Sequence, residues 1–484
     1  MATINRRDFL QNSAAMAAAL AGAGKFGQEA LAYEAKKEKK GSANETLRVA
    51  VIGVRGRGGE HVHSLAGNFN CAVTTICDAD EAMIGSSMRY VEKKQGKAPK
   101  FVKDLRHVMD DPAIDVVTTA TPNHWHALIS IWAMQAGKDV YVEKPVSHNV
   151  SEGRRIVEAA RKYNRICQTG TQSRSSTGLQ EAMRFLQSGK LGKVRVARGL
   201  CYKLRPSIGK VDHSQEVPST VDYNLWCGPS PMKPLMRKHL HYDWHWIWDH
   251  GNGDLGNQGI HEMDKARWGL GVNELPRSVT SVGGRFGYVD DGQTANTQMC
   301  IYDYGDKQLV FEVRGLPSDA LRGAKVGNIF HCDEGVLVIP NYSSAVVFDS
   351  NGKEIVRFNG GGNHFANFVE AVRNRQSSHL HADILEGHLS SALCHLGNIS
   401  YRLGTLEPFN KKTNALGDNK EAAETFARME EHLKTNKVPL DSTSYHLGRK
   451  LMIDPKTESF VNDAEANAYL TREYRKPFVV PEKV

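Results

Sequence analysis

The chain has 484 residues, long enough for two domains, and its charged and hydrophobic fractions of 24% and 40% are ordinary for a globular protein. A formal net charge of +8 is spread thinly, and the one dense basic run, KKEKK at 36–40, is typical of a solvated linker, so no nucleic-acid partner is expected. The 8 cysteines form no C-x-x-C pair, which excludes a zinc ribbon and gives no sign of a disulfide framework. No run of about eighteen apolar residues follows the N-terminal segment, so no membrane span is expected.

The first 32 residues have the pattern of an export signal. Arg6 and Arg7 precede an apolar stretch rich in alanine and glycine, which ends in Ala30-Leu31-Ala32. Paired arginines followed by Phe-Leu resemble a twin-arginine signal, and the small residues are typical of a cleavage site. The alternative is an amphipathic helix of a cytoplasmic protein. We expect an exported, periplasmic protein in which residues 33–46 form a linker.

From residue 47 onward, apolar strands and helices alternate regularly. Strands that are apolar along their whole length are covered on both faces, and helices between them indicate parallel crossovers. The sequence therefore predicts a doubly wound parallel sheet, a Rossmann domain, over residues 47–170. The expected strands are 47–54, 71–80, 115–122, 139–145 and 165–171, and the expected helices are 59–67, 81–96, 124–137 and 151–164.

The pattern changes after residue 171. Strands are expected at 191–202, 277–288, 295–305, 307–315 and 335–341, and helical spacing returns only over 364–403. This indicates an α+β domain with a largely antiparallel open sheet over residues 171–404. The extension 405–484 is not placed by its pattern. Because an open antiparallel sheet usually buries its free face, we expect a homodimer or homotetramer.

A glycine-rich turn, GVRGRG, joins the first strand to the first helix. Gly53 and Gly58 match the first and third glycines of the dinucleotide-binding pattern G-x-G-x-x-G, but Arg55 replaces the middle one. Either the arginine points away, or the phosphates of a cofactor meet its guanidinium, and Gly56 can supply the missing flexibility. We predict that this turn binds a dinucleotide through Gly53, Arg55, Gly56, Arg57 and Gly58.

An acidic residue lies at the distance that this pattern requires. Asp78 follows Gly58 by 20 positions and ends the second strand. A carboxylate there accepts hydrogen bonds from the ribose hydroxyls and repels a 2′-phosphate, which predicts NAD as the cofactor rather than NADP. The alternative is that Asp78 caps the helix that follows.

A lysine lies at the end of the strand VYVEKP. Burying a charge there costs free energy, so a functional role for the charge is expected. The carboxyl ends of strands in such a sheet face the ligand crevice, so Lys144 can hydrogen-bond a substrate hydroxyl or carbonyl oxygen. Burial and neighbouring cations would lower its pKa and suit it to acid–base catalysis. The alternative is a surface lysine paired with Glu143.

Three motifs, TPNHWH at 121–126, EKP at 143–145 and G-I-H-x-x-D at 259–264, resemble the glucose–fructose oxidoreductase/inositol dehydrogenase/MocA (Gfo/Idh/MocA) family. The resemblance implies a Rossmann domain followed by an open-sheet domain, a tightly held nicotinamide cofactor, and oxidation or reduction of a sugar, cyclitol or polyol. It also implies that Lys144 is catalytic. The residues that it places near the cofactor are Thr121, Asn123, His126, Glu143 and Gln172.

The same resemblance implies that His261 is the proton-transfer partner of Lys144. Many dehydrogenases of the family have an aspartate four residues earlier, on the same helical face, where this chain has Asn257. An amide can orient a sugar hydroxyl but holds no charge, so the residues implied as catalytic are Lys144, His261 and Asn257. Asp254 or Asp249 could substitute for the missing carboxylate. The alternative for His261 is a core histidine.

Residues 225–250 are crowded with aromatic side chains, whose flat faces suit sugar rings or core packing equally. The predicted substrate-binding residues are Tyr202, Trp244, Asp254, Asn257 and His261. His239, His241 and His245 lack a clear metal-binding spacing, and no metal is predicted. His388 and His395, seven residues apart on one helical face, line the rim of the pocket or, in the alternative that we favour, pack in the core or in a dimer contact.

The sequence thus predicts an exported, NAD-dependent oxidoreductase that transfers hydride between a nicotinamide and a carbon of a sugar or polyol. Because NAD is scarce outside the cytoplasm, the cofactor would stay in the protein. That constraint raises an alternative, an NAD-dependent glycosidase working by transient oxidation, elimination, hydration and re-reduction. A third hypothesis is a non-catalytic carbohydrate-binding protein.

Overall fold

The computed structural model describes residues 45–410 and 416–484. The predicted signal segment and residues 33–44 of the predicted linker lie outside the described residues. Residues Leu47–Val484 form one compact unit, to which everything below belongs. None of its described helices is long and apolar enough to cross a membrane.

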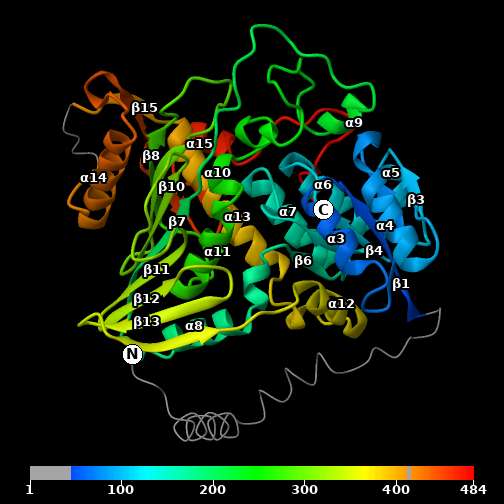
Figure 1. Cartoon of the computed structure of the whole chain (residues 1–484), viewed down its shortest axis with the longest axis horizontal. Coiled ribbons are helices and arrows are strands. Elements are labelled where there is room, and N and C mark those ends of the chain that lie inside the picture. The colour runs from blue at the N-terminus through cyan, green and yellow to red at the C-terminus, as the bar shows by residue number, and fades with distance from the viewer. Residues whose placement is uncertain (1–44, 411–415) are drawn as a thin grey trace, which may run out of the picture. The chain divides into compact units, whose positions relative to one another are not determined.

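The N-terminal part contains a parallel sheet of six strands in the order β3-β2-β1-β4-β5-β6 (Figure 1). Side chains of β4, β5 and β6 are buried throughout, as expected for strands covered on both faces. The predicted doubly wound fold is confirmed. The strands are β1 (Leu47–Ile52), β2 (Cys71–Cys77), β3 (Lys100–Val102), β4 (Val116–Thr119), β5 (Asp139–Val142) and β6 (Cys167–Thr169), and the helices are α3 (Arg57–Leu65), α4 (Gly85–Gln95), α5 (Arg106–Asp110), α6 (Asn123–Gln135) and α7 (Val150–Lys162).

The sequence pattern missed two elements of this domain and misjudged a third. β3 and α5 are only 3 and 5 residues long, too short to show a period. The helix expected at 81–96 is interrupted: a 3₁₀ turn, η2 (Glu81–Met83), comes first, and the α-helix starts at Gly85. Asp80 caps η2, because its side chain accepts a hydrogen bond from the backbone N–H of Ala82.

The second domain contains a twelve-stranded sheet, in which β7 and β10 pair in parallel and the other paired strands of the described residues run antiparallel. The main strand order is β14-β13-β12-β11-β7-β10-β9-β8-β16-β15, with β17 on β8 and β18 on β17. This confirms the predicted fold class. The strands are β7 (Val194–Tyr202), β8 (Ser278–Gly284), β9 (Thr297–Asp303), β10 (Gln308–Arg314), β11 (Val326–Cys332), β12 (Gly335–Ile339), β13 (Ser344–Asp349), β14 (Glu354–Asn359), β15 (Thr405–Pro408), β16 (Ser444–Leu447), β17 (Leu451–Asp454) and β18 (Ser459–Phe460).

Helices lie between this sheet and the Rossmann domain. Along β7, Ala197 and Cys201 join the core with α11 and α13, while Val196 and Leu200 point to the opposite face. The face toward α11 and α13 is called the inner face below, and the other the outer face. The helices are α8 (Thr177–Gln187), α9 (Tyr223–Cys227), α10 (Gly253–Gly256), α11 (Gly259–Leu270), α12 (His364–Asn374) and α13 (Ile384–Arg402), with 3₁₀ turns η3 (Gln172–Ser175), η4 (Asp243–Trp246) and η5 (Ser377–His379).

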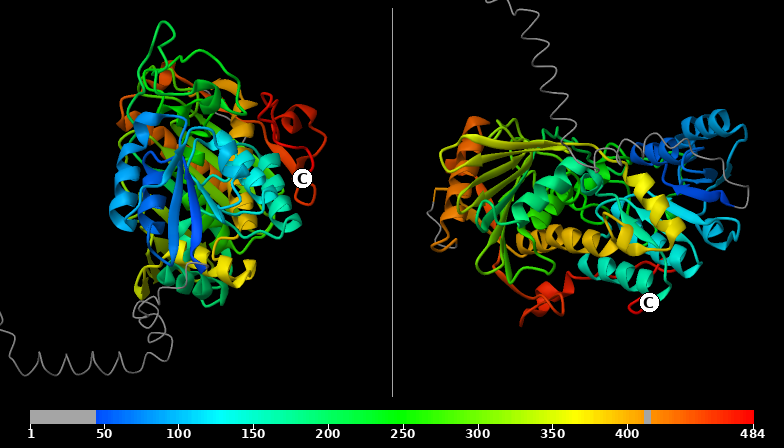
Figure 2. Two further views of the ribbon diagram at one scale, coloured as in Figure 1. Left: turned by 90° about the vertical axis from the view of Figure 1, so that its right-hand side faces the viewer. Right: turned by 90° about the horizontal axis from the view of Figure 1, so that it is seen from below.

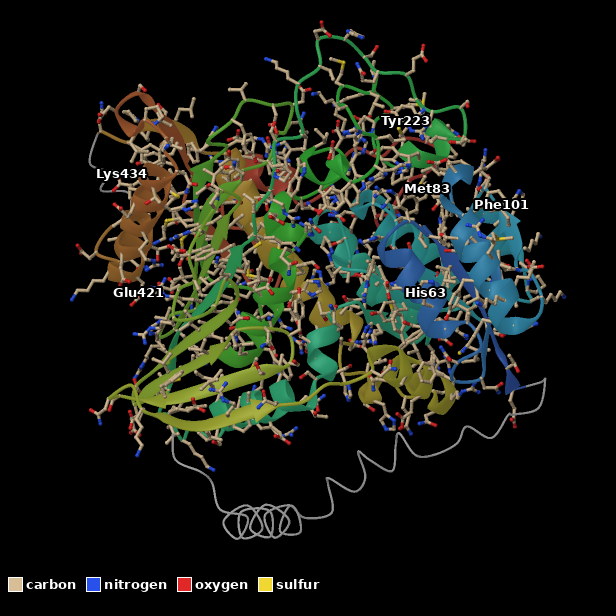
Figure 3. All side chains as sticks on the ribbon, viewed as in Figure 1. His63, Met83, Phe101, Tyr223, Glu421 and Lys434 are labelled. Carbon is tan, nitrogen blue, oxygen red and sulfur yellow. The ribbon has the colours of Figure 1, made fainter. Side chains whose placement is uncertain are left out.

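The C-terminal extension covers part of the outer face. Its helix α14 (Lys420–Thr435) packs Met429 and Leu433 in one cluster with Ile301 and Val310 of the sheet. Glu421 and Lys434 mark the two ends of this helix in Figure 3. Arg198 of β7 adds a buried hydrogen bond of 2.9 Å to Thr425. The chain therefore covers this part of the free face itself, and the predicted homo-oligomer stays a prediction.

The end of the extension returns to the Rossmann domain, after β16, β17, β18, a 3₁₀ turn η6 (Leu440–Ser442) and α15 (Ala464–Ala468) (Figure 2). Phe478 is 1% exposed and packs edge to face against Trp125 of α6, with ring centroids 5.3 Å apart, and at a tilt against Trp132, at 6.5 Å. Arg475 donates a hydrogen bond of 3.0 Å to the carbonyl of Gly228. These contacts tie the two domains together.

We expect Phe478→Ala to lower the free energy of unfolding by about 3–5 kcal/mol, because it removes a buried ring and leaves a cavity beside α6. Val479→Ala is the matched control, because Val479 is 41% exposed and its truncation should cost less than about 0.5 kcal/mol. Denaturant unfolding of both variants measures the difference. Equal losses would show that the tail does not hold the domains.

Candidate functional site

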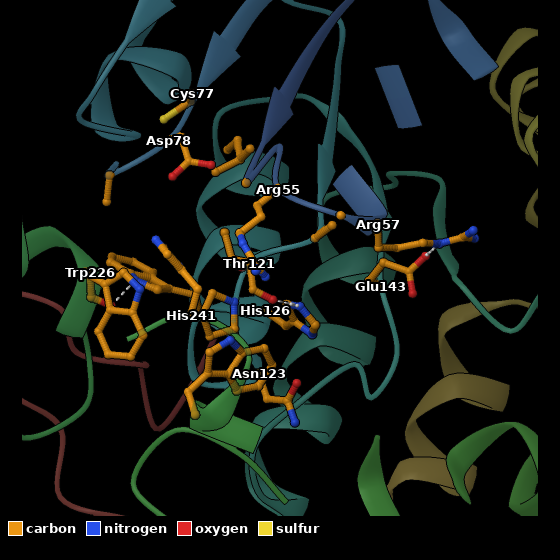
Figure 4. A pocket seen from close by; sticks show the side chains of 18 of the residues that line it. Arg55, Arg57, Cys77, Asp78, Thr121, Asn123, His126, Glu143, Trp226 and His241 are labelled. Atoms are coloured by element: carbon orange, nitrogen blue, oxygen red, sulfur yellow. Dashed lines mark hydrogen bonds and ion pairs between the residues drawn. The ribbon is translucent and has the colours of Figure 1, made fainter. Parts of the chain in front are cut away.

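A cavity of about 280 Å³ opens at the carboxyl ends of β1, β2, β4 and β5 (Figure 4). This is where the strand order reverses between β1 and β4, the position at which open α/β sheets bind ligands. The glycine-rich turn and the ends of β2, β4 and β5 line one side. Second-domain residues line the other side, at 225–226, 241–242, 244–245 and 257.

The glycine-rich turn needs its glycines for close packing. A Cβ on Gly58 would lie 1.7 Å from the carbonyl oxygen of Gly53, and Gly53 itself has φ +79° with no room beside the backbone of Thr121. The turn runs directly into the N-terminus of α3, whose N-cap is Gly56. Arg55 lines the cavity (Figure 4), which is the second of the two orientations left open by the sequence.

Asp78 lines the cavity beside this turn. Its carboxylate accepts hydrogen bonds of 2.9 Å from the backbone N–H of Val54 and 3.0 Å from that of Asp80. Burial raises the pKa of Asp78. The capping role that the sequence left open for Asp78 belongs to Asp80, and a contact with ribose hydroxyls stays a prediction.

Glu143 does not pair with the ammonium of Lys144. Its carboxylate accepts a hydrogen bond of 2.7 Å from Arg57 Nε and lies 3.2 Å from His61 Nε2, and it is 3% exposed. Burial opposes its ionisation, but the Arg57 charge and the His61 contact hold the pKa of Glu143 well below its ordinary value. This arrangement rules out the surface Lys144–Glu143 pair.

Lys144 lies at the floor of the cavity. Its Nζ donates a hydrogen bond of 3.0 Å to the backbone carbonyl of Asn257, and no described carboxylate lies within 4.0 Å of it. Burial lowers the pKa of Lys144, and the Glu143 charge offsets only part of that effect. A lysine whose pKa is lowered gives up its proton more readily than a surface lysine at the same pH.

The turns that follow β4 and β5 are joined by a buried histidine. His126 Nδ1 lies 2.6 Å from the carbonyl of Pro145, and Nε2 lies 2.8 Å from the carbonyl of Thr121. Asn123 Nδ2 donates a hydrogen bond of 2.9 Å to the side chain of Asn252. Thr121, Asn123 and His126 all line the cavity, so the structure brings these predicted cofactor residues together.

His261 lies in the first turn of α11, four residues after Asn257, and is not among the residues that line the cavity. It is 6% exposed, its ring packs edge to face on Tyr342 at 5.4 Å, and its Nδ1 has no hydrogen-bond partner among the described residues. Burial, followed by the charge of Lys144, lowers the pKa of His261 well below its ordinary value. The imidazole is therefore neutral and can accept or donate one proton.

Two predicted substrate residues are contradicted by the structure. Tyr202 points to the outer face of the sheet, away from the cavity, and its hydroxyl donates a hydrogen bond of 2.7 Å to buried Glu312. Asp254 is 1% exposed, and its carboxylate accepts hydrogen bonds of 2.8 and 2.7 Å from Arg205. A neutralised and enclosed carboxylate cannot replace the charge that Asn257 lacks.

The remaining predicted residues lie as follows. Trp244 lines the cavity and stacks on His245 with ring centroids 3.6 Å apart. Gln172 begins η3 and is not among the residues that line the cavity. Asp249 accepts a hydrogen bond of 2.7 Å from Lys233 and does not line the cavity either.

Three histidines that the sequence left without a firm role have hydrogen-bonding partners in the structure. His388 Nε2 lies 2.9 Å from Glu458, and His395 Nε2 lies 3.1 Å from Ser147 Oγ, which supports the core interpretation of both. His241 Nε2 lies 2.7 Å from Asp80. Within the described ranges, no three His, Cys, Asp or Glu side chains converge on a metal position.

Sequence reasoning missed the wall that residues 217–245 form against the end of β2. The backbone N–H groups of Asp222 and Glu81 donate hydrogen bonds to the carbonyls of Ala79, at 2.8 Å, and Thr220, at 3.2 Å. Trp226, His241 and Tyr242 thereby line the cavity, which Lys103 lines from the Rossmann domain. The crowding of aromatic and histidine residues was the only signal of this wall.

Family models and solved structures of known proteins match this chain in sequence and in fold. A family model described as "Oxidoreductase family, NAD-binding Rossmann fold" matches residues 47–171. A second model, described as "Oxidoreductase family, C-terminal alpha/beta domain", matches residues 177–432. The chain therefore belongs to the Gfo/Idh/MocA oxidoreductases, which are NAD-dependent enzymes.

Two curated relatives are named glycoside hydrolases. The glycosyl hydrolase family 109 protein 1 of Shewanella sp. (strain ANA-3) is 27% identical over 228 residues, covering 44% of this chain and 49% of that protein. The alpha-N-acetylgalactosaminidase of Shewanella oneidensis is 29% identical over 179 residues, covering 34% and 39%. The chain thus spans less than half the length of these curated relatives.

Solved structures share the fold. Levoglucosan dehydrogenase in complex with NADH and levoglucosan is 19% identical, with a TM-score of 0.53 over 72% of this chain and 97% of that one. The WlbA dehydrogenase from Bordetella pertussis, in complex with NADH and UDP-GlcNAcA, is 17% identical, with a TM-score of 0.54 over 73% and 97%.

The residues present fit NAD. The turn at Gly53 and Gly58 lets the backbone approach a pyrophosphate, and the N-terminus of α3 favours negative charge there. Asp78, for which the sequence predicts a contact with the ribose, and Arg55, which adds a cation, both line the cavity.

We expect Gly58→Ala to weaken NAD binding by at least about tenfold, because the new Cβ would displace the carbonyl of Gly53 and open the turn. Gly59→Ala is the matched control, because its Cβ would lie 3.6 Å from the carbonyl of Val54, an ordinary contact. Calorimetric titration of cofactor-stripped protein measures both. Unchanged affinity in Gly58→Ala would contradict the assignment of this turn.

Proposed function

We propose that the protein oxidises or reduces a hydroxyl or keto carbon of a sugar or polyol, using a nicotinamide held in the cavity. The observation that carries the proposal is the amine of Lys144, which lies at the cavity floor with no described carboxylate against it. The neutral imidazole of His261 lies one helical turn away from Asn257, whose carbonyl holds Lys144. Sugar ligands in the two structural neighbours support the substrate class.

The protein's own groups handle the proton of the reacting hydroxyl. Bound NAD supplies the hydride acceptor or donor. In the oxidation direction, Lys144 Nζ accepts the hydroxyl proton as the carbonyl forms, and the resulting ammonium then stabilises the carbonyl oxygen. His261, with one free ring nitrogen, relays that proton onward. Asn257 keeps Lys144 in place through its backbone carbonyl.

The proposal includes export through a twin-arginine signal, for which Arg6 and Arg7 are the support. Export places the protein where free NAD is scarce, so the cofactor must be carried and regenerated within the protein. The wall that joins Asp222 to Ala79 and His241 to Asp80 supports such retention, because it lies across the ribose end of the cavity.

A second candidate is an NAD-dependent glycosidase, favoured by the names of the two curated relatives. Transient oxidation of a hydroxyl acidifies the adjacent C–H, so the aglycone can leave by elimination. Water then adds, and the hydride returns to the sugar. Such a cycle consumes no cofactor, which suits a protein that retains it.

A non-catalytic carbohydrate-binding protein is a weaker candidate. Burying an amine without a carboxylate partner costs folding free energy, and a binding protein gains nothing from that cost at Lys144.

Aryl glycosides separate the two enzymatic candidates. Release of the aglycone without net NADH formation selects the glycosidase, and stoichiometric reduction of NAD, or a ketone product, selects the dehydrogenase. Absence of both reactions and of hydride exchange, across neutral and anionic sugars, would overturn the proposed function.

We expect Lys144→Met to lower kcat by about 10²–10⁴-fold, because proton transfer is lost. The rate of the oxidation direction in the unchanged protein should rise with pH until Lys144 is neutral, at a pH below that of an ordinary lysine, and Lys144→Met should abolish this rise. The exposed Lys97→Met is the matched control and should keep the full pH profile.

The stability of the same variant excludes a trivial loss of fold. Because the pKa of Lys144 is lower in the folded chain, the folded state binds fewer protons than the unfolded state, and stability rises with pH between the two pKa values. Lys144→Met removes this cost, so it should be at least as stable as the unchanged protein at pH 7. A clear loss of stability would show that the amine is structural.

A further inference from the structure

Two lysines converge on the start of α11. Lys144 Nζ donates to the backbone carbonyl of Asn257 at 3.0 Å, and Lys203 Nζ donates to the side-chain carbonyl of Gln258 at 3.0 Å. Because the two acceptors belong to successive residues, both ammonium groups lie at one turn of the chain. Among the described residues, neither lysine has a carboxylate within 4.0 Å.

The carboxylates around this turn are already occupied. Glu143 has Arg57 at 2.7 Å, Asp254 has Arg205 at 2.7 Å, and Glu262 has Lys265 at 3.4 Å. Glu262 is also fully buried, and burial raises its pKa to about 7, so it carries only part of a negative charge at neutral pH. Asn257 contributes no charge, so the lysines leave this turn with an excess of positive charge.

The acceptor that holds Lys203 is itself fixed. Gln258 Nε2 donates a hydrogen bond of 2.5 Å to the hydroxyl of Tyr342, so the amide oxygen turns toward Lys203. The same tyrosine ring packs against His261. Lys203 thus belongs to a cluster with Gln258 and Tyr342 that contacts His261, although its own side chain is exposed.

We propose that the substrate carries an oxyanion, a carboxylate or a phosphate or sulfate ester, which binds against Lys203. The inference rests on the proposed function and narrows its substrate class from neutral sugars to sugar acids or esters. A bound NAD would have its phosphates at the glycine-rich turn and Arg55, which line the cavity, whereas Lys203 is not among the lining residues, so those phosphates would not meet Lys203. A substrate anion supplies the countercharge that Asn257 lacks.

Matched substrate pairs test the proposal in the NAD-loaded protein. Aryl glucuronide against aryl glucoside, and aryl galacturonide against aryl galactoside, differ in a carboxylate, and the 6-phosphate and 6-sulfate forms test the ester sources. We expect the anionic member of at least one pair to have the higher kcat/KM by roughly 10–100-fold, the usual worth of a charge-assisted hydrogen bond.

Variants then assign the preference to Lys203. Lys203→Met should reduce the anionic-to-neutral ratio to near one, and Lys203→Glu should invert it. Asn257→Asp should also lower the ratio, because it adds a fixed carboxylate beside both lysines. Lys210→Met, an exposed lysine of the same segment, is the control and should leave the ratio unchanged.

Failure of this inference and failure of the proposed function give different results. Turnover of neutral sugars without an anionic preference, or a preference that survives Lys203→Met, overturns the inference and leaves the proposed function intact. If no sugar is turned over, binding affinity replaces kcat/KM as the measured quantity. The affinities for glucuronate and for glucose are then measured by the quenching of bound NADH fluorescence. Equal affinities for the two also overturn the inference.

Discussion

The ion pair between Glu143 and Arg57 is the interaction on which the rest of the site depends. The carboxylate is next to Lys144 in sequence and would neutralise its amine if it were free, but Arg57 and His61 hold it on the other side of the strand end. Lys144 is therefore left facing the cavity, with only a backbone carbonyl as partner. Burial of an amine without countercharge is what makes it reactive.

The periodic spacing of apolar residues along the sequence was enough to predict the Rossmann domain and several of the residues that line its cavity. The glycine-rich turn, Asp78 and Lys144 follow from the alternation of strands and helices, because strand ends in such a sheet meet at one edge. Tyr202 shows the limit. Its strand was predicted, but the side chains of a strand alternate between two faces, and only the packing of α11 and α13 shows which face meets the site.

Long-range pairing was the other limit. Nothing in the local sequence indicates that the carboxylate of Asp254 is paired. In the structure, Arg205, 49 residues away, donates hydrogen bonds to both of its oxygens. The extension shows the same problem in the sheet, where β16 pairs with β8 and α14 covers strands that lie much earlier in the chain. No local pattern carries such partners, because each partner is selected by the folded arrangement of the other elements.

The position of Phe478 has a consequence for how the enzyme acquires its cofactor. Trp125, which lines the NAD cavity, rests on this ring, although the ribosome makes Phe478 long after the Rossmann strands have emerged. The dinucleotide compartment therefore gains its outer support only late in synthesis. The cavity is therefore complete on this side only after the tail has been made and has docked against α6.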